Sequence, residues 1–384
     1  MSPIDHVEAL AGELRARLVE QRRAAAVAGE RERVELPAAV RGIVDEHAAL
    51  LSGEQRDQLA ERVLRDTVGL GPLEELLRDP AVEEVMVNGH EEVWVERRGR
   101  LERTAVRFAD EEQLRDVIER VLGPIGRRVD ELCPMADGRL ADGSRVNVVI
   151  PPLAVAGPAL SIRRFTGFRP DPDELVRRGT LDQAALKLLT AAVAERRNLI
   201  VSGGTGSGKT TVLNALSSLI EPGERIITIE DAAELNLQQP HVVRLESRPP
   251  GIEGSGEVSI RDLVRNCLRM RPDRIVIGEV RGAEAMDLLV ALNTGHQGAL
   301  STVHANGPEE ALRRIETLAM MAGLGVPHGV VREQLAAAID LVLHLERGPG
   351  GSRLATTLSE VVRAAGTATV RELWVRPAAS EVAL

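Results

Sequence analysis

The spacing of apolar positions divides the first part of the chain into a helical segment and a mixed segment. Residues 1–64 carry apolar side chains at helical spacing, as at Leu10, Leu14 and Leu18, which predicts N-terminal helices. In residues 65–160, short apolar runs are separated by Asn-Gly and Asp-Gly pairs, which are typical of β-hairpins. We therefore expect a small α+β domain, with hairpins at residues 85–95 and 139–147, a strand at 101–108 and an amphipathic helix at 111–122.

The longest regular pattern follows a stretch rich in Pro and Gly at residues 161–178, which predicts a linker. From residue 179 to 346, apolar runs alternate with segments of helical spacing, and this predicts a mostly parallel, doubly wound α/β sheet. Residues 347–384 are polar and Gly-rich at first and then weakly strand-like, so we place them outside this domain as a C-terminal tail. The predicted strands are residues 199–202, 225–230, 242–245, 274–279, 298–303 and 341–345.

The first of these strands leads into a glycine-rich sequence that precedes a helical pattern. Strand, G-x-x-x-x-G-K-T and helix in this order characterise the P-loop, and they disfavour the alternative of an ordinary glycine-rich turn. Glycines let successive backbone N–H groups face the phosphates of a nucleotide, and the helix adds its positive end. We expect Lys209 to reach the β- and γ-phosphates of ATP and the Thr210 hydroxyl to ligate Mg²⁺. The expected nucleotide-binding residues are Gly203, Gly204, Thr205, Gly206, Ser207, Gly208, Lys209, Thr210 and Thr211.

Two further predicted strands end in a carboxylate, at Glu230 and at Glu279. Ligands of parallel sheets bind at the carboxyl ends of the strands, so either glutamate is a candidate to orient the attacking water or to hold Mg²⁺, partly through water. Which of the two is the general base stays open. For the first strand end there is also a structural alternative, in which Asp231 caps a helix with Glu234 three residues later.

His296 and His304 flank another predicted strand. A histidine at a strand end can hydrogen-bond to a phosphate oxygen and respond to its loss, so both are candidate catalytic residues. The alternative for each is an ordinary structural histidine.

Four segments, taken in order, resemble the Walker A, Asp, Walker B and His boxes of the secretion-superfamily ATPases. They are residues 203–210, 230–231, 278–281 and 295–306, with Gly278 where a Walker B strand usually carries Asp. Upstream, residues 142–147, 150–152 and 161–165 are similar to the CpaF branch, the motors of tight-adherence (Tad/Flp) pili and related type II/IV secretion systems. The resemblance covers about residues 60 to 346.

The resemblance implies a homo-hexameric ATPase that couples ATP hydrolysis to domain motion and thereby powers pilus assembly or protein secretion. It implies a RecA-like P-loop domain preceded by a small PAS-like domain, and a cytoplasmic protein that docks on platform proteins of the inner membrane and is peripheral to it. In this family arginines from the N-terminal domain or the linker reach the phosphates. The matching residues are Arg139, Arg145, Arg163 and Arg164, and the alternative for each is solvated surface charge. Arg281, in the segment that resembles the Walker B box, is a further expected nucleotide-binding residue.

Composition narrows the choice of function. A formal net charge of −10 and 1% aromatic residues disfavour a nucleic-acid motor, because such proteins need positive surface and stacking side chains. Cys133 and Cys267 form no C-x-x-C pair, which argues for a reducing compartment and against a zinc site. Lys187 and Lys209 are the only lysines, and no apolar run is long enough to predict a membrane span.

Two alternatives to a secretion motor remain at this stage. Residues 51–55 resemble the signature of ABC transporter ATPases but precede the P-loop, so we expect Ser52 to cap a helix with Gln55 in a capping box. A nucleotide-controlled scaffold that binds ATP without turnover is disfavoured by the two strands that end in carboxylates.

Overall fold

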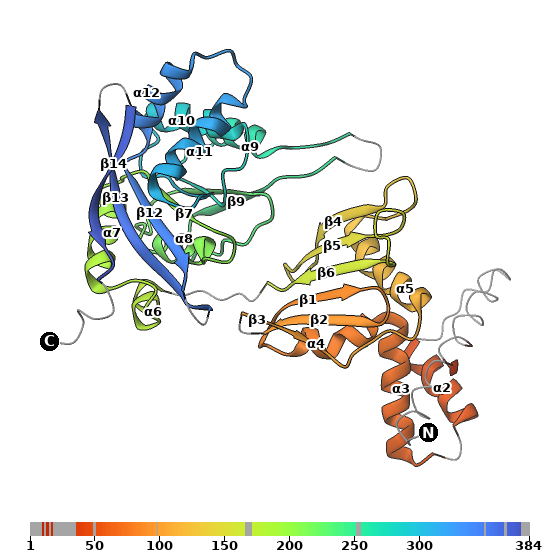
Figure 1. The fold of residues 1–384 in the computed structure, drawn as a ribbon. Helices are drawn as coiled ribbons and strands as arrows, with labels where there is room; N and C mark the ends of the chain where they lie inside the picture. The colour runs from red at the N-terminus through yellow and green to blue at the C-terminus, as the bar shows by residue number, and fades with distance from the viewer. Residues whose placement is uncertain are drawn as a thin grey trace. The chain divides into compact units, whose positions relative to one another are not determined.

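The computed structural model divides the chain into two compact units, Met1–Thr166 and Gly167–Leu384 (Figure 1). It describes residues 36–48, 51–97, 99–165, 171–250, 255–348, 351–364 and 367–377, together with residues 10, 13, 14 and 17.

Unit 1 begins with two packed helices, α2 (Leu36–His47) and α3 (Gly53–Val68). Their apolar positions form a small core that includes Leu14, while Leu18 lies outside the described residues. The predicted capping box is confirmed: the Gln55 N–H donates to Ser52 Oγ at 3.2 Å, and the Ser52 N–H donates to Gln55 Oε1 at 2.9 Å. The ABC-like sequence at this position therefore has a structural explanation.

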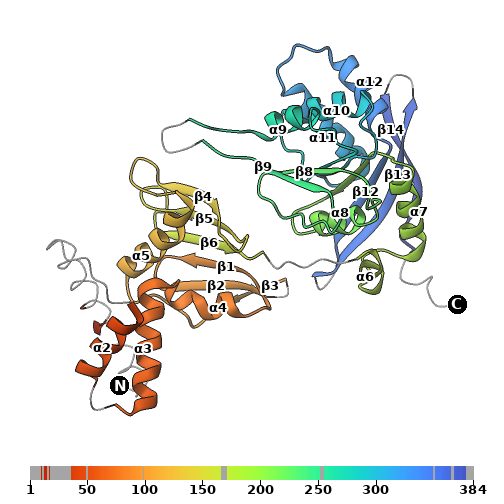
Figure 2. The same ribbon diagram turned by 180° about the vertical axis from the view of Figure 1, so that it is seen from behind.

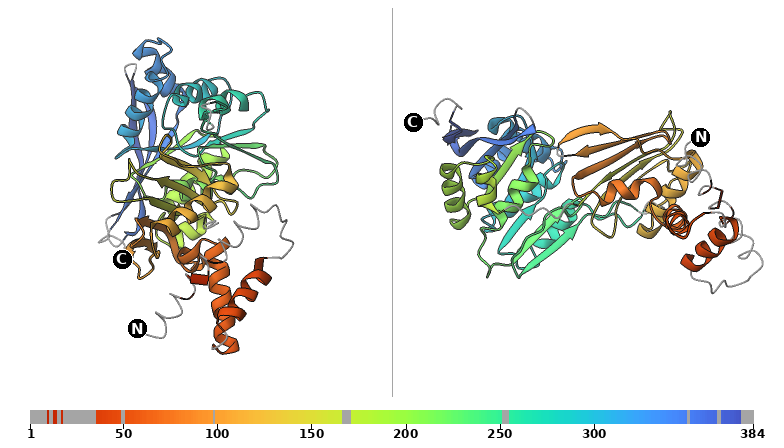
Figure 3. Two further views of the ribbon diagram at one scale, coloured as in Figure 1. Left: turned by 90° about the vertical axis from the view of Figure 1, so that its right-hand side faces the viewer. Right: turned by 90° about the horizontal axis from the view of Figure 1, so that it is seen from below.

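The rest of unit 1 is a six-stranded antiparallel sheet in the order β3-β2-β1-β6-β5-β4. Helices α4 (Glu74–Arg78) and α5 (Glu111–Leu122) share one apolar core with the sheet, so they cover one face of it (Figure 3). Both predicted hairpins and the predicted helix are confirmed. The strands are β1 (Val82–Asn88), β2 (Glu92–Arg97), β3 (Arg100–Arg103), β4 (Met135–Arg139), β5 (Arg145–Val149) and β6 (Ala159–Arg163), and the short helices η1 (Gly71–Leu73) and η2 (Gly123–Ile125) complete the unit.

The strand predicted at residues 101–108 is wrong in its second half. Strand β3 ends at Arg103, and the Thr104 hydroxyl then turns the chain: it donates to the carbonyl of Val93 at 2.9 Å and accepts the Val106 N–H at 3.2 Å. Phe108 then folds into the core below the sheet. Of the two large apolar residues at the ends of the predicted strand, Leu101 is exposed and only Phe108 is buried, so the apolar pattern does not mark one continuous strand.

Unit 2 is built on an eight-stranded sheet in the order β14-β13-β12-β7-β11-β10-β8-β9, with helices on both faces (Figures 1 and 2). Strands β12 through β9 in this order are parallel, so the predicted α/β class and each predicted strand are confirmed. The parallel strands are β7 (Leu199–Gly203), β8 (Ile226–Glu230), β9 (Val242–Glu246), β10 (Arg274–Ile277), β11 (Leu300–His304) and β12 (Leu341–Arg347).

The two faces of this sheet carry different helices. Helices α6 (Pro172–Arg177), α7 (Gln183–Ala194) and α8 (Lys209–Ser217) pack on one face. The other face is covered by α9 (Ile260–Cys267), α10 (Glu284–Asn293), α11 (Pro308–Met320) and α12 (His328–Ala338).

Two boundaries differ from those expected. Strand β6 and helix α6 occupy both ends of the predicted linker, so its described residues are largely structured. The sheet also continues past residue 346, because β13 (Arg353–Ala364) and β14 (Thr367–Val375) add to it as antiparallel strands. Trp374 is buried against α7 and donates from Nε1 to Asp182 Oδ2 at 3.1 Å, which fixes β14 to the unit.

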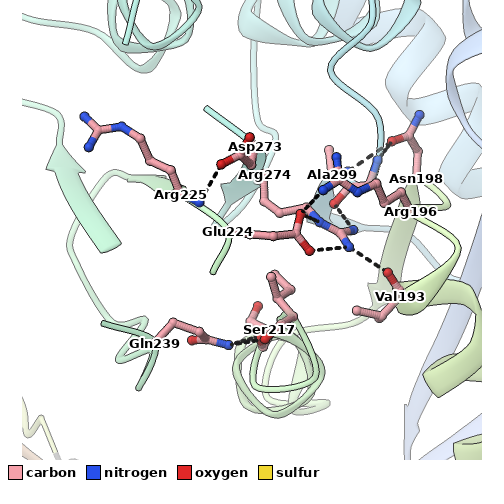
Figure 4. A network of polar contacts seen from close by, with 12 residues as sticks. Val193, Arg196, Asn198, Ser217, Glu224, Arg225, Gln239, Asp273, Arg274 and Ala299 are labelled. Atoms are coloured by element: carbon pink, nitrogen blue, oxygen red, sulfur yellow. Dashed lines mark hydrogen bonds and ion pairs between the residues drawn. The ribbon is translucent and has the colours of Figure 1, made fainter. Parts of the chain in front are cut away.

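A buried ion pair organises the amino-terminal edge of the unit 2 sheet (Figure 4). Arg274, which is 2% exposed, donates from Nε and Nη2 to the two carboxylate oxygens of Glu224 at 2.8 and 3.0 Å. Its remaining donors reach the carbonyls of Val193, at 2.8 Å, and Gly298, at 3.2 Å. A Cβ atom at position 298 would lie 2.1 Å from Arg274 Nη1, so only glycine fits beside the guanidinium.

The buried side chain of Asn198 also forms hydrogen bonds at the amino-terminal edge of the sheet, next to the start of β7. Its Oδ1 accepts the N–H groups of Gly298 and Ala299 at 2.8 and 3.0 Å, and its Nδ2 donates to the carbonyl of Ala338 at 2.6 Å. One side chain thus joins the starts of β7, β11 and β12.

We predict that Glu224→Gln lowers the free energy of unfolding of unit 2 by about 3–5 kcal/mol, because it leaves the Arg274 charge buried without a counter-charge. Arg196→Gln is the matched control: Arg196 pairs with the same carboxylate at 2.8 Å but is 48% exposed, so its loss should cost about 1 kcal/mol or less. Urea unfolding followed by Trp374 fluorescence in a Trp94→Phe background measures both. Equal losses of stability in the two variants would contradict the conclusion that Glu224 stabilises the unit by neutralising buried Arg274.

Candidate active site

The glycine-rich loop after β7 has the backbone that its sequence predicts. Gly206 and Gly208 have φ values of 71° and 92°, in the left-handed region that glycine adopts without strain. A Cβ atom at Gly203 would lie 2.5 Å from the carbonyl oxygen of Leu345 on β12. Glycine at these positions therefore allows both the curl of the loop and its close contact with the neighbouring strand.

Lys209 is the first residue of α8, and its side chain turns back into the loop. Its Nζ donates to the carbonyls of Gly203 and Gly204 at 3.0 and 2.9 Å. Burial lowers the pKa of Lys209, while the negative charge of Glu279 acts in the opposite direction. Thr210 and Thr211 follow in the first turn of the helix, both half-buried. The structure thus keeps residues 203–211 together around one ammonium group.

Glu230 ends β8 as a buried carboxyl, 3% exposed. Its Oε1 accepts the N–H groups of Glu234 and Leu235 at 3.0 and 2.9 Å. Burial raises the pKa of Glu230 to about 7, although these two hydrogen bonds oppose the shift. Its Oε2 is buried and has no hydrogen-bond partner among the described residues. The side chain therefore combines a perturbed pKa with an unused acceptor, which is typical of a functional group.

The glycine at 278, where Asp is usual, has a steric explanation. A Cβ atom at Gly278 would lie 2.9 Å from Cγ of Glu230. A larger residue would displace the buried carboxyl, so Glu230 and Gly278 are matched to each other.

An arginine joins the ends of β8 and β10. Arg281 donates from Nη2 to Glu279 Oε2 at 2.7 Å and from Nη1 to Asp231 Oδ2 at 3.5 Å, and the adjacent Glu279 raises the pKa of Arg281. The helix-cap alternative for Asp231 is wrong, because residues 231–241 form no helix. Asp231 instead accepts from Arg281 and, at 3.2 Å, from the Ser247 hydroxyl.

The sheet topology explains why these groups meet. The carboxyl ends of parallel strands lie at one edge, and β11 separates β7, which leads into the loop, from β10, which leads to Glu279. On β11, the Thr302 hydroxyl donates to the Gly278 carbonyl at 2.6 Å, and the Thr302 carbonyl accepts the Val280 N–H at 2.9 Å. Thr302 was not among the expected site residues, although the parallel order of the strands would place it at this edge.

The two candidate histidines lie at opposite ends of β11. His304 is the last residue of the strand, exposed, and opposite Gly203 in the register with β7. His296 precedes the strand, and its Nδ1 lies 3.2 Å from the carbonyl of Ala291 at the end of α10. Five strand residues span about 16 Å, so within one chain the structure brings His304 to the loop but not His296. The catalytic role of His296 stays a prediction.

Three of the four candidate arginines of unit 1 form a row across its sheet. Arg139, Arg145 and Arg163 are directly opposite one another on β4, β5 and β6. They alternate with core residues, so they lie on the face away from α5. The row continues on β1 with Glu84: burial raises its pKa, while the charges of Arg163 and Arg145 act to lower it.

Arg164 has a different place. Its Nη1 donates to the carbonyls of Asp79 and, at 2.9 Å, Val82, within unit 1. The structure therefore gives Arg164 an anchoring contact and does not place it in the row.

The described residues contain neither a metal-binding cluster of side chains nor a membrane-spanning helix. No three His, Cys, Asp or Glu side chains among them are grouped so as to hold a metal ion by themselves. None of the helices in the described part of the chain combines the length and apolar character needed to cross a membrane.

Comparison with known proteins gives consistent matches. The family model described as type II/IV secretion system protein matches residues 66–373. A Mycobacterium tuberculosis protein, which its name provisionally assigns to conjugal transfer, is 42% identical over 320 residues, covering 82% of this chain and 90% of that protein. The conjugal transfer protein TrbB of Rhizobium radiobacter is 34% identical, covering 76% and 88%. The fold is similar to that of the Legionella pneumophila ATPase DotB, at 23% identity and a TM-score of 0.53, covering 76% and 79%.

The raised pKa of Glu230 predicts a pH-dependent stability. The folded-state pKa of about 7 exceeds the ordinary value of 4.5. The stabilising contribution of protonated Glu230 to the free energy of unfolding is therefore complete below pH 4.5 and is lost as the pH rises through about 7. Gln has no proton to lose. The free energy of unfolding of Glu230→Gln should therefore equal that of the parent near pH 4.5 and exceed it by about 3 kcal/mol above pH 7.

Denaturant unfolding at pH 5 and pH 8 measures this difference. Glu246→Gln, which changes a half-buried carboxylate on β9, is the control and should show no comparable gain at pH 8. The same stability difference for Glu230→Gln at both pH values would contradict a raised pKa.

Proposed function

Because the chain belongs to the type II/IV secretion system protein family, we propose that it is an ATPase that hydrolyses ATP to ADP and phosphate to drive a secretion machine. One observation carries this proposal. Lys209, inside a loop of left-handed glycines, lies at the same edge of a parallel sheet as Glu230 and Glu279. That edge is where α/β sheets bind their ligands.

The described residues fit ATP and Mg²⁺. The Lys209 ammonium and the N–H groups at the start of α8 supply positive charge for the phosphates. The Thr210 hydroxyl would ligate Mg²⁺, and Glu230 and Glu279 would hold it through water. The unused Oε2 of Glu230 is an acceptor that such a water would satisfy. When bound, Mg²⁺ neutralises charge on the phosphates during transfer.

We assign the general base to Glu230. A carboxylate with a pKa of about 7 is both ionised and basic near neutral pH, which suits proton abstraction from water. Glu279 is held by Arg281 at 2.7 Å, so it is better suited to orienting water and metal. His304, beside the loop, is placed to hydrogen-bond to a γ-phosphate oxygen and to respond to its loss.

We also propose that unit 2 contains a RecA-like P-loop domain and that residues 65–160 form the PAS-like domain. Charge that develops on three phosphate oxygens is better stabilised by a second cation than by Lys209 alone. In a homo-hexamer the row of Arg139, Arg145 and Arg163 would supply it, and loss of phosphate would then free the row and permit domain motion.

The proposed machine is a Tad/Flp-type pilus or a related type II/IV secretion system. Residues 142–147 and 161–165, which are similar to the CpaF branch, favour the pilus, whereas the names of the two relatives favour a conjugation-type system. In either case the protein would act at the inner face of the cytoplasmic membrane by docking on platform proteins. Its net charge of −10 counts against nucleic acid as the direct substrate.

Lys209→Ala should abolish ATP turnover and weaken nucleotide binding, because it removes the charge that faces the β- and γ-phosphates. The chain offers a matched control in Lys187→Ala, which changes its other lysine, exposed on α7, and should leave kcat unchanged. Steady-state phosphate release from the purified protein measures both variants. Wild-type kcat in Lys209→Ala would overturn the proposed ATPase site.

The base assignment predicts different pH profiles for the two glutamates. In the parent, kcat/KM should rise as the pH passes through about 7, because Glu230 of the free enzyme must be ionised to accept a proton. Glu230→Gln should lower kcat by about 10²–10⁴-fold and remove this rise. Glu279→Gln should also slow hydrolysis but keep the rise and bind ATP nearly as the parent does. The reverse pattern would assign the base to Glu279.

A further inference from the structure

A pair of arginines from the C-terminal strands lies against the glycine-rich loop. Strands β12 and β13 pair antiparallel, and Arg347 is directly opposite Arg353 at the end of this pairing. Two positions earlier in the same ladder, Leu345 is opposite Ala355, and both are buried in the core shared with α8. Because side chains two positions apart share a face of a sheet, both arginines lie on the α8 face.

Distances from the loop glycines show which parts of the two arginines lie next to the loop. A Cβ atom at Gly206 would lie 3.7 Å from Arg347 Nη1. A Cβ atom at Gly208 would lie 3.1 Å from Cδ of Arg353, so the methylene groups of this arginine pack on the residue that precedes Lys209. Both arginines remain exposed at their ends of the strands. They are therefore part of the loop's immediate surroundings and open to solvent.

The arrangement concentrates positive charge. Like charges directly opposite each other on neighbouring strands destabilise a sheet. Here the two arginines also lie beside Gly206 and Gly208 of the loop, close to the positive end of α8. Glu346, which directly precedes Arg347, lies on the other face of β12, where its Oε1 is 3.6 Å from His344 Nε2. An anion bound in the loop would be attracted by this positive charge.

We propose that Arg347 and Arg353 bind the phosphate chain of the nucleotide and favour di- and triphosphates over monophosphates. The inference rests on the proposed function and adds to it a binding contribution from the strands beyond residue 346. Arginine suits this role because its guanidinium forms paired hydrogen bonds with phosphate oxygens. The two arginines belong to the same unit as the loop, so this contribution differs from that of the row in unit 1.

The test compares the affinities of ADP and AMP, measured by calorimetry on the full chain, for Arg347→Gln and Arg353→Gln. Each variant should bind ADP about tenfold more weakly, since it loses charge-assisted hydrogen bonds to phosphate oxygens, which are moderate in strength because these side chains are solvent-exposed. AMP affinity should change much less. Arg363→Gln, on the same strand β13 and about 33 Å away, is the matched control and should bind ADP like the parent.

Thermal unfolding supplies a second readout. Without nucleotide, the Arg347→Gln and Arg353→Gln variants should be about as stable as the parent, because both side chains are exposed. With ADP, they should gain less stability than the parent. A purely structural role would instead lower stability without nucleotide and leave the gain from ADP intact, and this result would overturn the proposal.

Other outcomes separate the inference from the function on which it rests. Parent-like ADP affinity in both variants, an equal loss of AMP affinity, or an equal effect of Arg363→Gln would overturn the arginine assignment while leaving the ATPase site in place. A parent protein that binds no ADP, together with a Lys209→Ala variant that does not differ from it, would overturn both.

Discussion

The chemistry of unit 2 depends on the parallel register of its central strands. That register is fixed at the amino-terminal edge, where Arg274 and Asn198 hold the starts of β7, β10, β11 and β12 through buried hydrogen bonds. At the opposite edge, the same register brings the loop after β7 to the level of Glu230 and Glu279. Because a shift of one residue would reverse the facing of every side chain on a strand, the polar network at one edge determines the geometry of the other.

The parts of this site that depend on short stretches of sequence could be predicted. The loop glycines, Lys209 and the carboxylates at two strand ends follow from local patterns, and the structure has them on the expected elements. Residues that depend on pairing between distant strands could not be predicted. No local pattern shows that Arg347 meets Arg353, that Gly278 leaves space for Glu230, or that Arg139, Arg145 and Arg163 align.

The failures have physical causes of the same kind. The polar, glycine-rich residues just after residue 346 predict a tail outside the α/β domain. In the structure, Leu358 and Trp374 are instead buried in the core of unit 2. Their burial depends on the antiparallel ladder that β12 begins. The strand predicted at residues 101–108 is too long, because one threonine hydroxyl can end a strand without any change in the pattern of apolar residues along the chain.

The two hydrogen bonds from Lys209 to its own loop have a consequence for the release of product. A phosphate in the proposed site would have to replace the carbonyls of Gly203 and Gly204 as acceptors of the Lys209 ammonium. The net free energy of binding is therefore reduced by the loss of these two hydrogen bonds. In the proposed ATPase, once the phosphate leaves, the ammonium would return to those carbonyls and would not be left as an unsatisfied half-buried cation. The loop thereby gives up some affinity for its ligand and gains a lower barrier to dissociation, which favours repeated cycling over tight retention.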